Sequence, residues 1–138
     1  MHRSALPLLA CAAAVAAGAG CGQSSSREQV REVATRFAAA VAAGDGAAAC
    51  RQLAPAAAAA LERQERRDCP AALAALRLQA PGPVAAVRLF VTSGQVVFDG
   101  GDSAFLDRGP EGWRLSAIGC RFDDGKPASR PATCAAEA

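Results

Sequence analysis

The sequence predicts an α+β domain in which helices come first and an antiparallel sheet follows. Two observations lead to this fold class. Between residues 26 and 79, apolar residues recur at the spacing of helix faces, and helix-capping residues stand between the segments. Between residues 84 and 120, short apolar runs at period two are joined by glycine-containing turns, which is typical of hairpins. Because the helical stripes need an apolar surface to cover, we expect the N-terminal helices to pack on one face of the sheet.

The first predicted helix begins at a capping box and carries one apolar stripe. Ser26 and Gln29 have the spacing at which a hydroxyl and an amide satisfy the first free N–H groups of a helix. Gly44 is expected to end the helix, because glycine adopts the left-handed terminal conformation at little cost. The apolar residues at helical spacing in between are Val30, Val33, Ala34, Phe37, Ala38 and Val41.

Shorter helices and then strands are expected to follow. Aspartate caps helices, and proline suits a first turn because its missing N–H is not needed there. The expected helices are 46–53 after Asp45, 55–67 from Pro55, and one from Asp68 or Cys69 with Pro70 to about residue 79. The expected strands are 84–92, 95–99, 103–108 and 113–120, which form a meander. Residues 121–138 contain Asp-Asp-Gly and prolines and are predicted to be an irregular tail.

Residues 1–20 predict an export signal. Arg3 gives a positive start, residues 4–20 are uncharged and mostly apolar or small, and small residues precede Cys21. Cys21 with Gly22 and the following serines resembles the lipobox of bacterial lipoproteins, in which the cysteine is diacylated and becomes the first residue of the mature chain. The resemblance implies an extracytoplasmic domain anchored in the membrane by lipid at Cys21. Residues 21–26 are then expected to be a short tether.

Two other interpretations of the leader stay open. Leu8, Leu9 and Ala10 before Cys11 fit the lipobox pattern, although they leave a short apolar core for the signal. Cleavage without lipid attachment would make the protein secreted instead of membrane-anchored. In each case, export would remove the N-terminal segment from the folded domain.

Composition excludes several kinds of chemistry for a chain without its leader. The protein has 15 Lys and Arg and 13 Asp and Glu, and without Arg3 the basic side chains number 14. This balance gives no basic stripe for nucleic acid or for an anionic membrane surface. The single histidine, His2, lies in the leader, and tyrosine is absent. An imidazole for a catalytic triad, for a general base near neutral pH or for a metal site is therefore missing, and we expect no catalytic residue, cofactor or metal.

Four cysteines lie beyond the leader: Cys50, Cys69, Cys120 and Cys134. An even number in an exported domain indicates disulfides, for which three pairings are possible. We favour Cys50–Cys69, which would join two helices close in sequence, and Cys120–Cys134, which would join the tail to the last strand. A zinc site usually has closely spaced cysteine pairs, which this chain lacks. Zinc ligation and free thiols remain the alternatives.

Four stretches follow one another between the first helix and the last strand: Ala42 to Cys50, Asp68 to Leu73, Gly101 to Leu106 and Gly112 to Cys120. Their order resembles the NTF2-like superfamily, which includes SnoaL-like and ketosteroid-isomerase-like proteins, and more closely small lipoproteins built on that fold. The resemblance covers roughly residues 26 to 120, so residues 27–120 would form the domain. It implies helices on a curled, cone-shaped sheet and is compatible with enzymes and with non-catalytic domains alike.

Sequence offers a candidate pocket but no catalytic group. Trp113 would either line the mouth of the cone and stack on a ligand or pack under the first helix against Phe37. Phe98 and Leu115 complete the candidate pocket. Three aspartates, Asp99, Asp102 and Asp107, lie in or near the sheet, and the first two flank a turn. We expect a non-catalytic accessory or interaction domain with an envelope protein as partner. A binder of small apolar ligands is the alternative, and an isomerase-like or cyclase-like enzyme is a second one.

Overall fold

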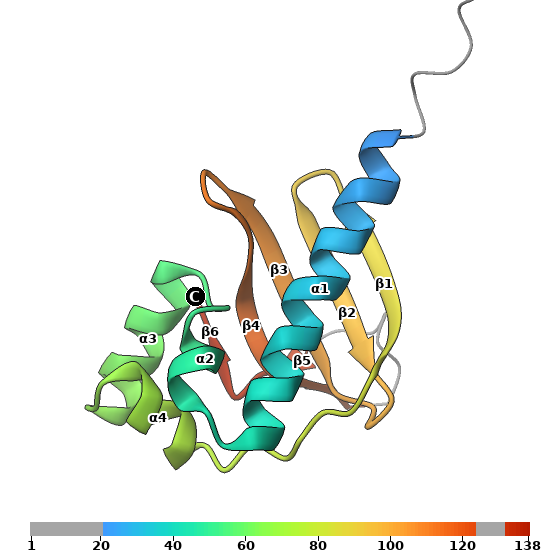
Figure 1. Cartoon of the computed structure of the whole chain (residues 1–138). Coiled ribbons are helices and arrows are strands. Elements are labelled where there is room, and N and C mark those ends of the chain that lie inside the picture. The colour runs from blue at the N-terminus through green and yellow to red at the C-terminus, as the bar shows by residue number, and fades with distance from the viewer. Residues whose placement is uncertain (1–20, 124–131) are drawn as a thin grey trace, which may run out of the picture.

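The structure, a computed structural model, describes residues 21–123 and 132–138, with side chains from 22 to 123 and from 133 to 138. The helices are α1 (Cys21–Ala43), α2 (Gly46–Cys50), α3 (Pro55–Glu65) and α4 (Cys69–Ala75). The strands are β1 (Val84–Phe90), β2 (Ser93–Phe98), β3 (Ser103–Gly109), β4 (Gly112–Phe122), β5 (Ala132–Thr133) and β6 (Ala136–Glu137). Helix α1 lies across one face of an antiparallel sheet, as the sequence predicts, and the shorter helices gather at the end of the sheet where β4 and β6 lie (Figure 1).

Strands β1 to β4 form a meander in which each strand pairs with the next. Along the edge that β3 leaves free, β4 pairs with Leu53 and with β6, and its last residues pair with β5. The prediction of an irregular tail over residues 121–138 is therefore wrong at both of its described ends. The edge of β4 presents N–H and C=O groups that need partners, and the tail supplies them.

Helix α1 begins at Cys21, and the predicted capping box at Ser26 is wrong. The expected tether over residues 21–26 is instead the first part of this helix. The Gln29 amide donates to the Ser25 hydroxyl oxygen one turn earlier, at 3.3 Å, instead of closing a cap. Residues 22–25 are exposed, so their small and polar side chains continue the helix without a packing requirement.

The end of α1 is set by glycine, as predicted. Gly44 has φ +68°, and its N–H donates to Val41 O at 3.1 Å. The Asp45 N–H donates to Ala40 O at 2.9 Å. These two bonds form a Schellman motif, which satisfies carbonyls that would otherwise lack partners at the end of a helix.

The predicted apolar stripe of α1 packs on the sheet. Val30 and Ala34 are fully buried, Phe37 is 3% exposed, and α1 contacts β1, β2 and β4. A Cβ placed on Gly94 of β2 would lie 3.4 Å from the Val30 methyl groups, so helix and sheet are in van der Waals contact. The helix thus covers the part of the core that its spacing of apolar residues indicates.

The shorter helices confirm one predicted cap and correct another. Asp45 caps α2, because its carboxylate accepts from the Ala48 N–H at 2.8 Å. Asp68 makes no capping bond to α4; the Cys69 N–H donates instead to Glu62 Oε1 of α3, at 3.0 Å. Helices α2 and α4 end earlier than residues 53 and 79, where the prediction placed them.

Candidate functional site

The residues predicted to line a pocket fill the interior of the domain. Phe37, Phe98 and Trp113 are each 3% exposed and Leu115 is fully buried. The space that Phe37 and Phe98 line measures about 20 Å³, which is room for roughly one water molecule and not for a ligand. The structure therefore brings the four predicted residues together in one core.

Trp113 carries an unpaired polar atom into that core. Its indole N–H is buried and has no hydrogen-bond partner among the described residues. Trp113 belongs to the same buried cluster as Phe37, so the structure supports its packing role under α1. A ligand could reach the indole only if the core opened.

The three aspartates of the sheet are engaged in local contacts or exposed to solvent. Asp99 is exposed beside the β2–β3 turn. Asp102 Oδ1 lies 3.0 Å from Arg121 Nε, and Asp107 Oδ1 accepts from the Ser93 hydroxyl at 2.8 Å. These contacts are those of turn and surface residues.

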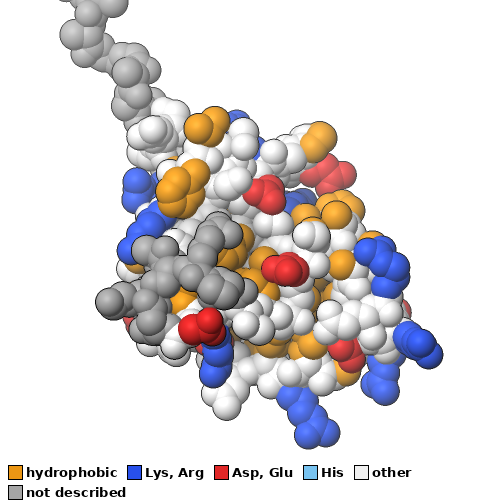
Figure 2. All heavy atoms as spheres, turned by 180° about the vertical axis from the view of Figure 1, so that it is seen from behind, with side chains coloured by type: hydrophobic (Ala, Val, Ile, Leu, Met, Phe, Trp, Pro, Cys, Tyr) orange, Lys and Arg blue, Asp and Glu red, His pale blue; other side chains and the backbone are white. Residues whose placement is uncertain are grey.

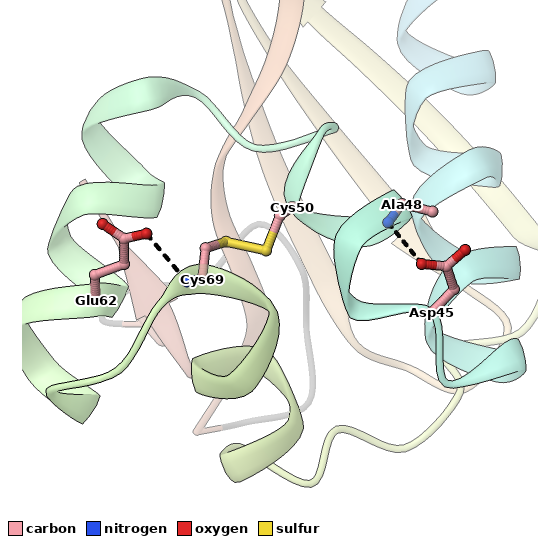
Figure 3. Close-up of a disulfide and its surroundings, with 5 residues drawn as sticks. All are labelled: Asp45, Ala48, Cys50, Glu62 and Cys69. Carbon is pink, nitrogen blue, oxygen red and sulfur yellow. Dashed lines mark hydrogen bonds between the residues drawn. A yellow bond between two sulfur atoms is a disulfide. The ribbon is translucent and has the colours of Figure 1, made fainter.

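The cysteines form the two disulfides that the sequence favoured. Cys50 at the end of α2 is bonded to Cys69 at the start of α4, and Cys120 of β4 is bonded to Cys134 of the tail. Figure 3 shows the first disulfide, with Glu62 on one side and Asp45 on the other. Sulfur atoms bonded to each other in this way leave no thiolate to bind zinc.

A groove that sequence reasoning missed lies next to the first disulfide. It measures about 530 Å³, within the range of small-ligand sites, and runs between the end of α1, α2 and α4. Val41, Leu73 and Leu78 contribute its large apolar side chains, and alanines from these helices make up much of the rest. The runs of alanine in the sequence were the signal that could have predicted this groove, because small side chains on facing helices leave space between the helices.

The walls of the groove are held close together. A Cβ on Gly46 would lie 2.8 Å from the Pro70 carbonyl oxygen, so α2 approaches α4 at a distance that only glycine allows. The Cys50–Cys69 disulfide joins the same two helices. Preformed walls of this kind lower the conformational cost of binding.

The polar groups of the groove are charged and few. Asp45, Asp68 and Arg77 line it together with the apolar residues. Asp45 is occupied as the cap of α2, whereas Asp68 makes no capping bond, and Arg77 is exposed with a left-handed φ of 48°. An apolar floor with charges of both signs is suited to orienting a bound molecule, and it offers no nucleophile with an adjacent base.

None of the helices within residues 21–123 and 132–138 is long and apolar enough to cross a bilayer. Over the same ranges, no group of three or more His, Cys, Asp or Glu side chains is placed to hold a metal ion.

Comparisons with protein-family models, with curated proteins and with solved structures gave no match to this chain.

Proposed function

We propose that this protein is a lipoprotein with a non-catalytic, NTF2-like accessory domain on the outer side of a membrane. The observation that carries the proposal is the pairing of all four cysteines beyond the leader into disulfides. Disulfides of this kind persist in oxidising compartments and are rare in the cytosol. The leader-like residues 1–20 and the lipobox-like setting of Cys21 agree with export.

The helix that contains Cys21 bears on how an anchor there would hold the domain. Residues 21–43 are helical, so an anchor at Cys21 would connect to the domain through a continuous helix. Two acyl chains anchor a protein stably, whereas one chain gives only marginal binding. The domain would then stand at the membrane surface on α1, with little freedom to move away.

An accessory role is supported by where the open space lies. The interior is packed, whereas the groove between α1, α2 and α4 includes the exposed residues Ala74 and Arg77 in its lining. A partner protein could insert an apolar side chain there, next to Asp68 and Arg77 at the rim. The groove volume of about 530 Å³ also favours a second candidate function, the binding of a small apolar ligand.

The anchor is tested by intact mass and cell fractionation of the native protein. We expect a membrane-bound form that starts at Cys21 and is heavier by two or three acyl chains. A Cys21→Ala variant should lose the added mass and the membrane attachment, whereas a matched Cys11→Ala variant should keep both. An unmodified, soluble wild-type protein would refute the anchored form.

The two candidate functions are separated by filling the groove. Ala74 lines the groove and is exposed, so Ala74→Trp should occupy it with little damage to the core. Ala39 is also exposed, on α1, and is absent from the groove lining, so Ala39→Trp is the matched control. Loss of a co-purifying small molecule from Ala74→Trp alone, seen by native mass spectrometry, would identify a ligand binder. Loss of a protein crosslink from Ala74→Trp alone would identify a docking domain.

A further inference from the structure

The turn between β1 and β2 exposes two large apolar side chains. Phe90 is 58% exposed and Val91 is 97% exposed, and they are the large hydrophobic residues that the described part of the chain leaves in solvent. Val91 also has a φ of +48°. This left-handed conformation is unfavourable for a β-branched residue and is easy for glycine or asparagine. Glycine or asparagine at position 91 would therefore make the folded state more stable than the exposed valine does.

This turn lies at the end of the molecule where α1 begins. Arg27 Nη1 donates to Val87 O at 2.9 Å, and Arg31 Nη1 donates to Val84 O at 3.0 Å. As the helix advances from 27 to 31, its contacts on β1 move back from 87 to 84, so α1 runs antiparallel to β1. The start of α1 and the end of β1 therefore lie at the same end of the molecule, as Figure 1 shows.

The two features are also nearly level with each other. The three residues from Val87 to Phe90 rise about 10 Å along the strand, and a helix covers that distance in about seven residues. The six residues from Arg27 back to Cys21 rise about 9 Å along α1, which brings Cys21 close to the level of the turn. A bilayer that holds Cys21 would thus meet the turn of Phe90 and Val91.

An arginine also lies beside the apolar turn, next to Asp107, whose carboxylate accepts from the Ser93 hydroxyl. The Arg108 N–H donates to Thr92 O at 2.8 Å, which places β3 and its exposed arginine beside the turn. The Arg108 side chain makes no ion pair with any described residue. Figure 2 shows hydrophobic side chains exposed at the same upper end of the molecule, seen from behind. Exposed apolar side chains gain free energy when they enter the acyl boundary of a membrane, and a cation beside them is attracted to anionic headgroups.

We propose that Phe90 and Val91 enter the outer layer of the bilayer to which Cys21 is attached, with Arg108 at the phosphate level. This inference rests on the proposed function, because the anchor supplies the proximity. The lipid chains would hold the protein, and the turn would set the orientation of the domain relative to the membrane. The groove would then face a defined direction for its partner.

The experiment uses the full lipoprotein purified from its own membranes and reconstituted in phosphatidylcholine–phosphatidylglycerol vesicles. Phe90→Trp places a fluorescent side chain in the turn, and Gln79→Trp places one in the exposed α4–β1 connection, which runs along the opposite end of the molecule (Figure 1). Wild-type protein gives the baseline from buried Trp113, which is 3% exposed. Vesicles with brominated acyl chains quench only tryptophans that reach the bilayer.

We expect the fluorescence of Phe90→Trp to shift to shorter wavelength when vesicles are present and to be quenched by brominated lipid. The fluorescence of Gln79→Trp and of the wild-type protein should show neither change. Quenching that is equal in both variants, or absent from both, overturns the inference and leaves a lipidated mass intact as support for the anchor. A blue shift of Phe90→Trp that depends on protein concentration and needs no vesicles also overturns it, because the turn then contacts a second copy of the chain.

The two proposals fail in different ways. If the native protein carries no lipid, the anchor is refuted, and the unmodified variants are mixed with the same vesicles. Selective quenching of Phe90→Trp would still support membrane entry by the turn, and its absence would refute it.

Discussion

Gly46 at the start of α2 lies against the backbone of α4, so that a Cβ at this position would stand 2.8 Å from the Pro70 carbonyl oxygen. Neither residue can give way without moving a helix, because the Cys50–Cys69 disulfide joins α2 to α4 next to this contact. The contact keeps the walls of the groove at their spacing.

Gly46→Ala is therefore expected to destabilise the fold. Overpacking of this kind costs about 1–3 kcal/mol, which thermal or urea unfolding resolves. Gly22→Ala is the control, because a Cβ there meets nothing within 4 Å and the residue is in the exposed first turns of α1. Equal stability of the two variants would contradict the close approach of α2 and α4.

The N-terminus of α4 offers a second test. Glu62→Ala removes the carboxylate that accepts from the Cys69 N–H and should cost about 1 kcal/mol, as the loss of a helix cap does. Asp68→Ala should change stability by much less, because Asp68 makes no capping bond. The reverse order of the two effects in urea unfolding would show that Asp68 is the cap after all.

Trp113 is expected to contribute to stability through its volume and not through its N–H. Trp113→Ala should cost about 3–5 kcal/mol, as large truncations in a core do. Trp113→Phe should cost clearly less, because the indole N–H has no partner to lose among the described residues. An unchanged melting temperature for Trp113→Ala would refute the core role.

The turn residue Val91 should be replaceable with a gain in stability. Val91→Asn should relieve about 1 kcal/mol of left-handed backbone strain, and little packing is lost because the side chain is 97% exposed. Val91→Ala keeps a Cβ without the branch and should gain less. A lower melting temperature for Val91→Asn would show that the valine side chain packs in the folded state.

Each disulfide should stabilise the fold by an amount that depends on the length of the loop it closes. Their cysteines are 19 and 14 residues apart, so paired Cys→Ser changes should each cost about 3 kcal/mol in the chain-entropy model. Mass spectrometry of the unreduced protein should find both bridges and no alkylatable thiol among these four cysteines. Crossed pairs would overturn the connectivity.

Local signals in the sequence were sufficient for much of the fold. The spacing of Val30, Ala34 and Phe37 identified the buried face of α1, and Gly44 marked its end, because these features depend on neighbours in the chain. The prediction that a capping box at Ser26 starts the helix was wrong, although it too used a local signal. A capping pattern permits a helix start, but exposed polar residues before it can continue the same helix.

By itself, the sequence determined the order of helices and strands, the antiparallel meander, the cap at Asp45 and the even set of cysteines. Tertiary structure decided the rest: the tail on the edge of β4, Glu62 as the cap of α4, the filled interior around Trp113 and the groove between the helices. The physical reason is the distance along the sequence over which each kind of interaction acts. Caps and periodicity act within a few residues, whereas edge pairing and cavity volume depend on how side chains distant in sequence fill the space between elements.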